Sequence, residues 1–403
     1  MLTLNFSNTY AKLLILGILL TPFFGIFEVL ALIKGTLISQ GTALTPVYIK
    51  VLKDIVFATI IMMGILELYV GRRIIFNRPY TLFIVLTACS AFISFFFIDP
   101  IIFIAGVRWL LPLLIFPFIY RYVDADLQSR IAKWLIILLI VGLFLQIVQL
   151  FITAGIWGSN VFGLGLRNPG FYIIPSSMAC FAMLTAYYAR HYCNNGFLRK
   201  ITVFLLVPVS ILLTASGTGI ISLTLFLSYI LYCNVKQKFI IFAIVIAILT
   251  SQIALIPILT NRSSIYESMK IRIELLPELA SLKNAFVSSN FGSATNTGVL
   301  LNPSSSTTVI ADSTVNSLIY NTGFVSLLFF GCFLYKSLFR TINRGNVSFA
   351  LVLFPFFLTT ILFELFPANL LLMVNLAYFS NPLNKNLAYK SGPSKSLGPK
   401  FVL

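Results

Sequence analysis

The sequence predicts an all-α, polytopic membrane protein, and three features carry that prediction. Of its 403 residues 59% are hydrophobic and only 10% are charged, and the mean hydropathy is +0.98. The apolar residues form runs of about 20, the length that a helix needs to cross a bilayer. Backbone groups in hydrocarbon must find partners within their own segment, so each run should be a helix. A β-barrel is excluded, because its strands would alternate apolar and polar residues over roughly ten positions.

About twelve spans are expected, in a membrane domain that covers residues 1–380. The first run is too long for a signal peptide and should remain as an anchor. Boundaries are hardest to set in the tight pair over 200–234 and in 348–381, where Pro367 interrupts an apolar stretch. The expected spans are 12–33, 51–70, 80–98, 101–120, 134–153, 171–189, 200–216, 217–234, 239–258, 314–335, 348–366 and 367–381.

The positive charge is distributed asymmetrically along the chain. The formal net charge is +17, from 28 Lys and Arg against 11 Asp and Glu. With the N-terminus inside, about 19 of the 28 basic residues fall in inside loops or in the C-terminal tail. The charge is therefore interpreted as a topology signal that places both termini in the cytoplasm, and nucleic-acid binding is excluded as its explanation.

Two outside loops are long enough to carry chemistry, 154–170 and 260–313. In the longer loop, Ser264 and Glu267 have capping-box spacing, which predicts a short helix through about residue 275. Pro277 suits the first turn of a second helix, and a stretch rich in Ser, Thr, Asn and Gly follows. The tail, 381–403, is polar and is expected to be disordered on the cytoplasmic side.

Arg167 and Asn168 lie where the chain re-enters the membrane after the shorter outside loop. The surrounding residues, 163–171, are rich in Gly and contain Asn-Pro-Gly, which indicates an irregular turn. An arginine on the outside departs from the charge asymmetry, and its planar guanidinium suits phosphate oxygens. The alternative is an arginine that only snorkels to the membrane interface.

Arg272 is expected in the last turn of the first loop helix, on a face that is otherwise apolar. A charge in such surroundings needs a partner or a ligand. The alternatives to a ligand are a salt bridge to Glu274, Glu278 or Asp312, or a favourable interaction with the helix dipole.

Arg108 lies inside an expected span, where an arginine is costly and is a functional candidate. It is assigned either to substrate binding or to a structural ion pair. The carboxylates considered for that pair are Asp99, Glu28, Glu67 and Glu364.

Asp312 precedes the tenth span and has two interpretations. It is either the N-cap of that helix or a general base on the outer face. Arg262, at the start of the long loop, is assigned to substrate binding together with Arg108 and Asn168. Residues 216–219, Ser-Gly-Thr-Gly, are expected to form a tight turn between two spans, because they lack the Lys and the strand of a phosphate loop.

No metal site or cofactor is expected. The single histidine, His191, lies on the inside, and the five cysteines have no metal-ligand spacing. Asp124 and Asp126 have Asp-x-Asp spacing, but they lie in a short inside loop with no room for a soluble catalytic domain.

Four short stretches resemble the superfamily of O-antigen polymerases and O-antigen ligases, which are bacterial membrane glycosyltransferases. Their order along the chain matches, and the long outside loop falls between two late spans. The second stretch departs from the family, because Gly217 stands where an arginine often follows the serine. The four stretches are 165–171 with Pro175 and Ala179, 213–219, Arg272 with 290–294, and 312–314 with 320–324.

The resemblance implies a polymerase of undecaprenyl-diphosphate-linked oligosaccharides at the periplasmic face of the inner membrane. The growing glycan is transferred from its lipid diphosphate to a hydroxyl of the next lipid-linked unit. The enzyme positions the reactants and stabilises the leaving diphosphate, so Arg167, Arg272 and Asp312 are the expected catalytic residues. Glu274 and Glu278 are alternative candidates for the base, and the sequence does not choose among the three carboxylates. Membrane lipids and a chain-length regulator protein are the partners that the resemblance implies.

Three other functions compete with this interpretation. An O-antigen ligase would carry a histidine in its large outer loop, and this chain has none there. A flippase for lipid-linked oligosaccharides would show repeat symmetry between its halves, which is not found. A transferase that uses lipid monophosphate sugars would need a carboxylate in the first outer loop, where Asp54 lies beside Lys50 and Lys53.

Overall fold

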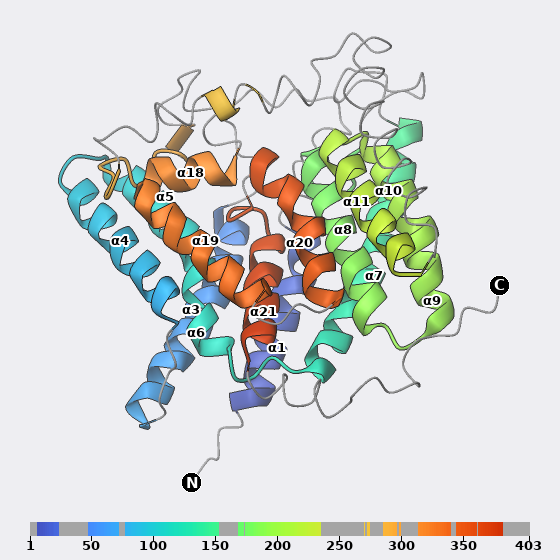
Figure 1. The fold of residues 1–403 in the computed structure, drawn as a ribbon, viewed down its shortest axis with the longest axis horizontal. Helices are drawn as coiled ribbons and strands as arrows, with labels where there is room; N and C mark the ends of the chain where they lie inside the picture. Colours follow the sequence, from blue (N-terminus) through green and yellow to red (C-terminus); the bar gives the residue numbers. More distant parts are fainter. Residues whose placement is uncertain are drawn as a thin grey trace.

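A computed structural model describes the chain in segments, and all of its regular structure is helical within them (Figure 1). The predicted all-α class is therefore confirmed for this part of the chain. The described residues are 6–23, 47–71, 77–152, 168–172, 174–234, 270, 272–274, 285–295, 298–299, 313–339, 344–360 and 362–381.

The helices follow one another with short connections wherever both flanks are described. In chain order they are α1 (Phe6–Leu19), α3 (Val47–Tyr69), α4 (Arg78–Phe95), α5 (Pro100–Leu114), α6 (Phe116–Ile119), α7 (Ala125–Ile152), α8 (Pro175–Tyr192), α9 (Gly196–Ile201), a π-helical turn η1 (Thr202–Leu206), α10 (Val207–Thr214), α11 (Gly217–Asn234), α18 (Thr314–Thr322), α19 (Phe324–Phe339), α20 (Arg344–Thr359) and α21 (Ala368–Ser380).

Five helical segments among the described residues are long and apolar enough to cross a membrane. They are Phe6–Phe23, Arg78–Phe95, Pro100–Ile119, Ala125–Phe151 and Gly196–Thr214. Four shorter apolar helices accompany them: Gly217–Cys233, Phe324–Phe339, Arg344–Thr359 and Ala368–Ser380. The total of about twelve spans stays a prediction.

Helix α8 lies at the centre of the right-hand half of the bundle in Figure 1, between α7, α10, α11 and α20. Every residue from Ser177 to Ala189 is buried. Small side chains let neighbouring backbones approach closely, which suits helix packing in a membrane. Gly219 of α11 is one such position, because a Cβ there would lie 2.7 Å from the Cβ of Ala179.

The connections gather at two ends of the bundle (Figure 1). The inner end, lower in the figure, carries the α6–α7 and α8–α9 connections, and there Tyr120 donates a hydrogen bond to the carbonyl of Ser380. The outer end, upper in the figure, carries the α4–α5 and α10–α11 connections and α18. The terms inner and outer follow the orientation predicted from the basic residues.

The structure corrects three expected spans. The first helix begins at Phe6 and not at residue 12. The expected span 314–335 is broken at Gly323, which adopts φ +92° and separates α18 from α19. The expected span 348–366 ends at Thr359.

Thr360 and residues 362–367 form a non-helical turn below the outer end of α20 (Figure 1). The helices on its two sides are short. Helix α20 has 16 residues and α21 has 13, so they reach about 24 Å and 20 Å at 1.5 Å per residue. Both fall short of a hydrocarbon core of about 30 Å. Non-helical backbone at such a depth is tolerated where it is buried in protein or lines an aqueous cavity.

Candidate functional site at the outer end

The turn formed by Thr360 and residues 362–367, called the outer turn below, is held by three separate elements. Thr314 of α18 donates its backbone N–H to the carbonyl of Thr360 over 3.1 Å, and its hydroxyl oxygen accepts from the N–H of Leu362 at 2.8 Å. Trp109 of α5 lies against Phe363, with ring centroids 5.3 Å apart. Tyr172 donates its hydroxyl to the carbonyl of Phe366 over 3.1 Å. Three segments that are distant in sequence therefore converge on this turn.

Three buried polar atoms, in the outer turn or in the segments that contact it, have no hydrogen-bond partner among the residues that the structure describes. They are Nε1 of Trp109, Oγ1 of Thr360 and Nδ2 of Asn168. Buried polar groups are nearly always satisfied, and an exception calls for water or a ligand group to complete it. The outer turn and its contacts thus offer unsatisfied hydrogen-bonding groups to a polar molecule, in surroundings that are otherwise apolar.

Asn168, predicted from sequence as a substrate contact, is 1% exposed and its backbone is firmly held. Its N–H donates to the carbonyl of Leu213 over 3.0 Å. Its carbonyl accepts from Nε2 of Gln146 on α7 at 2.9 Å, and Ser210 donates its hydroxyl to Oε1 of the same glutamine at 2.8 Å. The residue that follows Arg167 is therefore fixed to both α7 and α10.

Gly170 continues this anchorage. Gln149 of α7 donates from Nε2 to the carbonyl of Gly170 at 2.7 Å and accepts its N–H at Oε1 over 2.9 Å. Gly170 adopts φ +66°, which only glycine takes without strain. A Cβ there would lie 3.1 Å from the carbonyl oxygen of Gly142. The sequence indicated a turn here, and the structure adds that two buried glutamines define its geometry.

Arg272 is helical, as predicted, together with the two residues that follow it. Its carbonyl accepts a hydrogen bond from Nδ2 of Asn316 over 3.1 Å. One of its expected salt-bridge partners is otherwise engaged, because Glu274 lies 3.6 Å from Nζ of Lys270. Asn316 and Thr314 are two positions apart on α18. One turn of α18 therefore holds both the backbone of Arg272 and the outer turn.

A further part of the long loop is anchored beside α18. Asn321 accepts the backbone N–H groups of Gly292 and Ala294 at Oδ1, each over 3.1 Å. Ser94 of α4 accepts the N–H of Phe291 at 3.0 Å. Gly292 has φ +91°, and a Cβ there would lie 2.1 Å from the carbonyl oxygen of Ile102. The resemblance drew attention to 290–294, but the role of Asn321 and Ser94 as anchors was missed, because these contacts join residues far apart in sequence.

Arg108 forms an ion pair that sequence reasoning did not select. Its Nε lies 2.7 Å from Oδ2 of Asp54 on α3, and the two side chains are 36% and 15% exposed. Two expected partners act elsewhere. Asp99 caps α5 by accepting the N–H of Ile101, and Glu67 accepts the hydroxyl of Tyr122 at 2.6 Å. The expected list of partners for Arg108 was therefore wrong. Of the two roles considered for it, the structure shows an ion pair, while substrate binding stays a prediction.

The remaining predicted site residues, Arg167, Arg262 and Asp312, lie outside the described residues. The interpretation of Asp312 as the N-cap of the next helix is nevertheless wrong. The N-cap of α18 is Ser313, whose hydroxyl accepts the N–H of Asn316 at 3.4 Å.

Metal-ligating side chains do not gather within the described part of the chain. No group of three or more His, Cys, Asp or Glu side chains is close enough there to hold an ion. All five cysteines are free thiols. Asp126 of the Asp-x-Asp pair is exposed and forms an i,i+4 ion pair with Arg130 at 3.1 Å.

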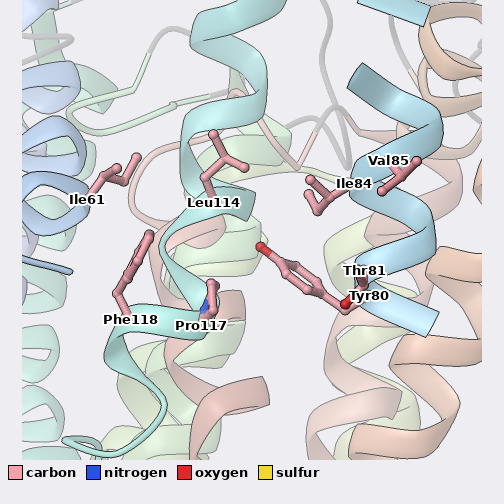
Figure 2. A pocket seen from close by; sticks show the side chains of 8 residues that line it. All are labelled: Ile61, Tyr80, Thr81, Ile84, Val85, Leu114, Pro117 and Phe118. Carbon is pink, nitrogen blue, oxygen red and sulfur yellow. The ribbon is translucent and has the colours of Figure 1, made fainter. Parts of the chain in front are cut away.

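An apolar pocket of about 210 Å³ lies between α3, α4, α5 and α6, and Figure 2 shows the side chains that line it. The Tyr80 ring reaches from α4 toward α5, where its hydroxyl donates to the carbonyl of Leu113 at 2.8 Å. With that hydroxyl engaged, the pocket suits hydrocarbon and offers nothing to a glycan or a phosphate. The lining residues are Ile61, Tyr80, Thr81, Ile84, Val85, Leu114, Pro117 and Phe118.

The fold and the site define a class: an all-helical protein with candidate membrane-spanning helices and a polar, non-helical site at one end of the bundle. Comparisons with protein-family models, with curated proteins and with solved structures give no match.

Proposed function

We propose that this protein is a glycosyltransferase that polymerises undecaprenyl-diphosphate-linked oligosaccharide units at the periplasmic face of a bacterial inner membrane. The sequence resemblance to O-antigen polymerases suggests this reaction. The observation that supports it best is the convergence on α18, where Thr314 holds the outer turn and Asn316 holds the backbone of Arg272.

The proposed reaction places modest demands on the protein. The glycosidic bond from the anomeric carbon of the growing glycan to its lipid diphosphate breaks, and the diphosphate leaves with the electron pair. A hydroxyl of the next lipid-linked unit forms the new bond and loses its proton to a base. In this proposal Asp312 is that base. Arg167 and Arg272 bind the leaving diphosphate, whose charge they stabilise through bidentate hydrogen bonds.

The outer turn suits the acceptor end of this reaction. Sugar hydroxyls both donate and accept hydrogen bonds. They could therefore pair with the unsatisfied polar atoms of Trp109, Thr360 and Asn168. A site whose polar groups are already buried and fixed needs little reorganisation when the substrate arrives. The ring of Trp109 packs edge-to-face with Phe363, and its role in this proposal is as a hydrogen-bond donor from Nε1.

Arg108 has a structural role in this proposal, together with a partial role toward substrate. Its pairing with Asp54 ties α3 to α5, one residue before Trp109. Because the Arg108 side chain is 36% exposed, the other nitrogens of its guanidinium remain accessible to an anion. The five-donor geometry of arginine allows both contacts at once.

The experiment that tests the function is the glycan pattern of a deletion strain. Loss of a polymerase leaves lipopolysaccharide with a single core-linked repeat, and the ladder of longer chains disappears. Loss of a ligase instead leaves core without any repeat, while lipid-linked polymer accumulates. Loss of a flippase leaves repeats on the cytoplasmic side, where externally added glycan-specific reagents cannot reach them. Either of the last two patterns refutes the proposal.

A further inference from the structure

Three arginines from separate helices come together at the inner end of the bundle. Arg190 lies in the last turn of α8, Arg199 lies in α9, and Arg344 is the first residue of α20. Helix α8 packs against both α9 and α20. Arg190 and Arg199 are half-buried and Arg344 is exposed. We call these three residues the inner arginine cluster.

The three charges are close enough to act on one another. Arg190 follows the predicted span 171–189. Its pKa is lowered first by burial and then by the positive charge of Arg199, with an opposing effect of Cys233 and a further lowering by Arg344. The ion pairs found in the described part of the chain involve other residues, Arg108, Arg130 and Lys270. No carboxylate therefore offsets the repulsion within the inner arginine cluster there.

His191, beside Arg190, supplies a second and independent observation. Its Nε2 is buried and has no hydrogen-bond partner in the described part of the chain. Its ring lies against that of Tyr187, with centroids 5.0 Å apart. Burial, and then the charge of Arg190, lower the pKa of His191 to about 4. The imidazole is therefore neutral at pH 7, and a neutral ring can present an N–H donor to an anion without adding to the repulsion.

The surroundings indicate the depth at which an anion would sit. Phe197 is 75% exposed and lies two residues before Arg199, at the beginning of the candidate span Gly196–Thr214. Aromatic residues and basic residues together are typical of the membrane–water interface, at the level of lipid headgroups. The exposed phenyl ring therefore indicates that this end of α9, which also carries Arg199, lies at the level of lipid headgroups.

We propose that the inner arginine cluster binds the phosphate group of an anionic phospholipid of the inner leaflet. Guanidinium groups bind phosphate oxygens in bidentate fashion. Three of them around one phosphate convert mutual repulsion into attraction. This site lies at the opposite end of the bundle from the outer turn, so the proposal is independent of the proposed polymerase reaction.

The rival explanation is that these arginines only set the topology. Basic residues on inside loops have that effect wherever they stand, so topology requires neither convergence nor partial burial. The two explanations differ in what they predict for binding. If the arginines only set the topology, they attract anionic lipids weakly, as any equal number of basic residues would. If they form a binding site, one anionic lipid stays bound per chain.

Native mass spectrometry of the full chain in neutral detergent tests the proposal. The probes are phosphatidylglycerol, phosphatidylcholine and inorganic phosphate. We expect one phosphatidylglycerol to stay bound per chain. Arg190→Gln or Arg199→Gln should weaken that binding at least about tenfold, because each removes a charge-assisted contact. A charge-matched control, Arg121→Gln, removes one exposed basic residue and should leave the affinity within about twofold.

Arginine-to-lysine variants keep the topology signal and the fold while removing the bidentate geometry. Arg190→Lys and Arg199→Lys should therefore bind phosphatidylglycerol more weakly with an unchanged thermal unfolding midpoint. Equal affinity in the cluster variants and in the charge-matched control overturns the proposal. Equal retention of phosphatidylcholine overturns it as well. If millimolar inorganic phosphate displaces the lipid and binds with the same dependence on the arginines, a soluble phosphate replaces the lipid as the ligand.

Discussion

Asn316 of α18 donates from Nδ2 to the backbone carbonyl of Arg272 over 3.1 Å, so a residue in the long loop is fixed by a side chain that is itself 2% exposed. Two residues earlier on the same helix, Thr314 holds the outer turn. This arrangement sets the position of an arginine relative to a group of unsatisfied polar atoms. The proposed reaction depends on that relative position more than on any single contact.

The first prediction concerns Asn316 as a positioning residue. Asn316→Leu removes the hydrogen bond to Arg272 while retaining bulk, and we expect shorter glycan chains with a fall in kcat of about tenfold, since a small misplacement of a catalytic group is costly. The matched control is Asn346→Leu. Asn346 is also buried and donates to a carbonyl, that of Leu338, but at the inner end. If both variants shorten the chains equally, the effect is one of stability alone.

The second prediction separates the two roles of Arg108. Asp54→Asn and Arg108→Gln should each lower the stability of the purified protein by about 1–3 kcal/mol, the range for a charged hydrogen bond, reduced here by solvent exposure. The exchange Asp54→Arg with Arg108→Asp should recover most of the lost thermal stability if the pair is structural. Full recovery of chain length along with stability would remove any role for Arg108 toward substrate.

The third prediction concerns topology, which rests on the basic-residue asymmetry. A single cysteine at Ser289, placed in a variant without native cysteines, should react with a membrane-impermeant maleimide in intact spheroplasts. Cysteines at Asn77 and Asn194 should react only after the membrane is opened. Labelling of Asn194 and protection of Ser289 in intact spheroplasts would reverse the orientation and place the outer turn in the cytoplasm.

Much of the fold was predictable, because a strong local signal decides it. Continuous apolar runs predicted α4, α7 and α11 to within a few residues, except that α7 begins nine residues before its expected span. A tight turn between two helices was predicted over 216–219, but the structure has it at Ala215, φ +47°, and Ser216, and Gly217 already begins α11. Propensity could not show the break at Gly323, since a glycine inside an apolar run is equally compatible with a continuous helix.

The candidate site was less predictable, because its contacts are non-local. The sequence marked Arg108 as a costly residue inside a span, but its partner lies 54 residues away on α3. No pattern in the sequence indicates which carboxylate faces Arg108 once the helices pack. Asn321 and Gln149 show the same limit. A buried amide in an apolar run signals that a partner exists, but the partner is a backbone group chosen by the packing.

The fourth prediction concerns metal dependence. The proposed reaction uses arginines to stabilise a diphosphate that is already a good leaving group, so purified protein should polymerise lipid-linked repeats at an unchanged rate in millimolar EDTA. Product is measured by gel electrophoresis of the released glycan. Activity lost in chelator and restored by magnesium or manganese would require a metal-assisted mechanism instead.

The fifth prediction concerns the two arginines assigned to the diphosphate. Each truncation to alanine removes a charge-assisted contact to the leaving group, which should cost about 2–4 kcal/mol, or roughly 10²–10³ in rate. Arg167→Lys and Arg272→Lys should rescue activity only in part, because an ammonium lacks the bidentate fork. Lys283→Ala, in the same long loop, serves as the control and should retain long chains.

The chain-length profile of Arg272→Ala, measured beside its abundance in the membrane, tests the central claim most directly. The proposal predicts normal abundance with long chains nearly abolished. Normal chains in Arg272→Ala would contradict it, and so would a loss of chains that only follows disappearance of the protein from the membrane.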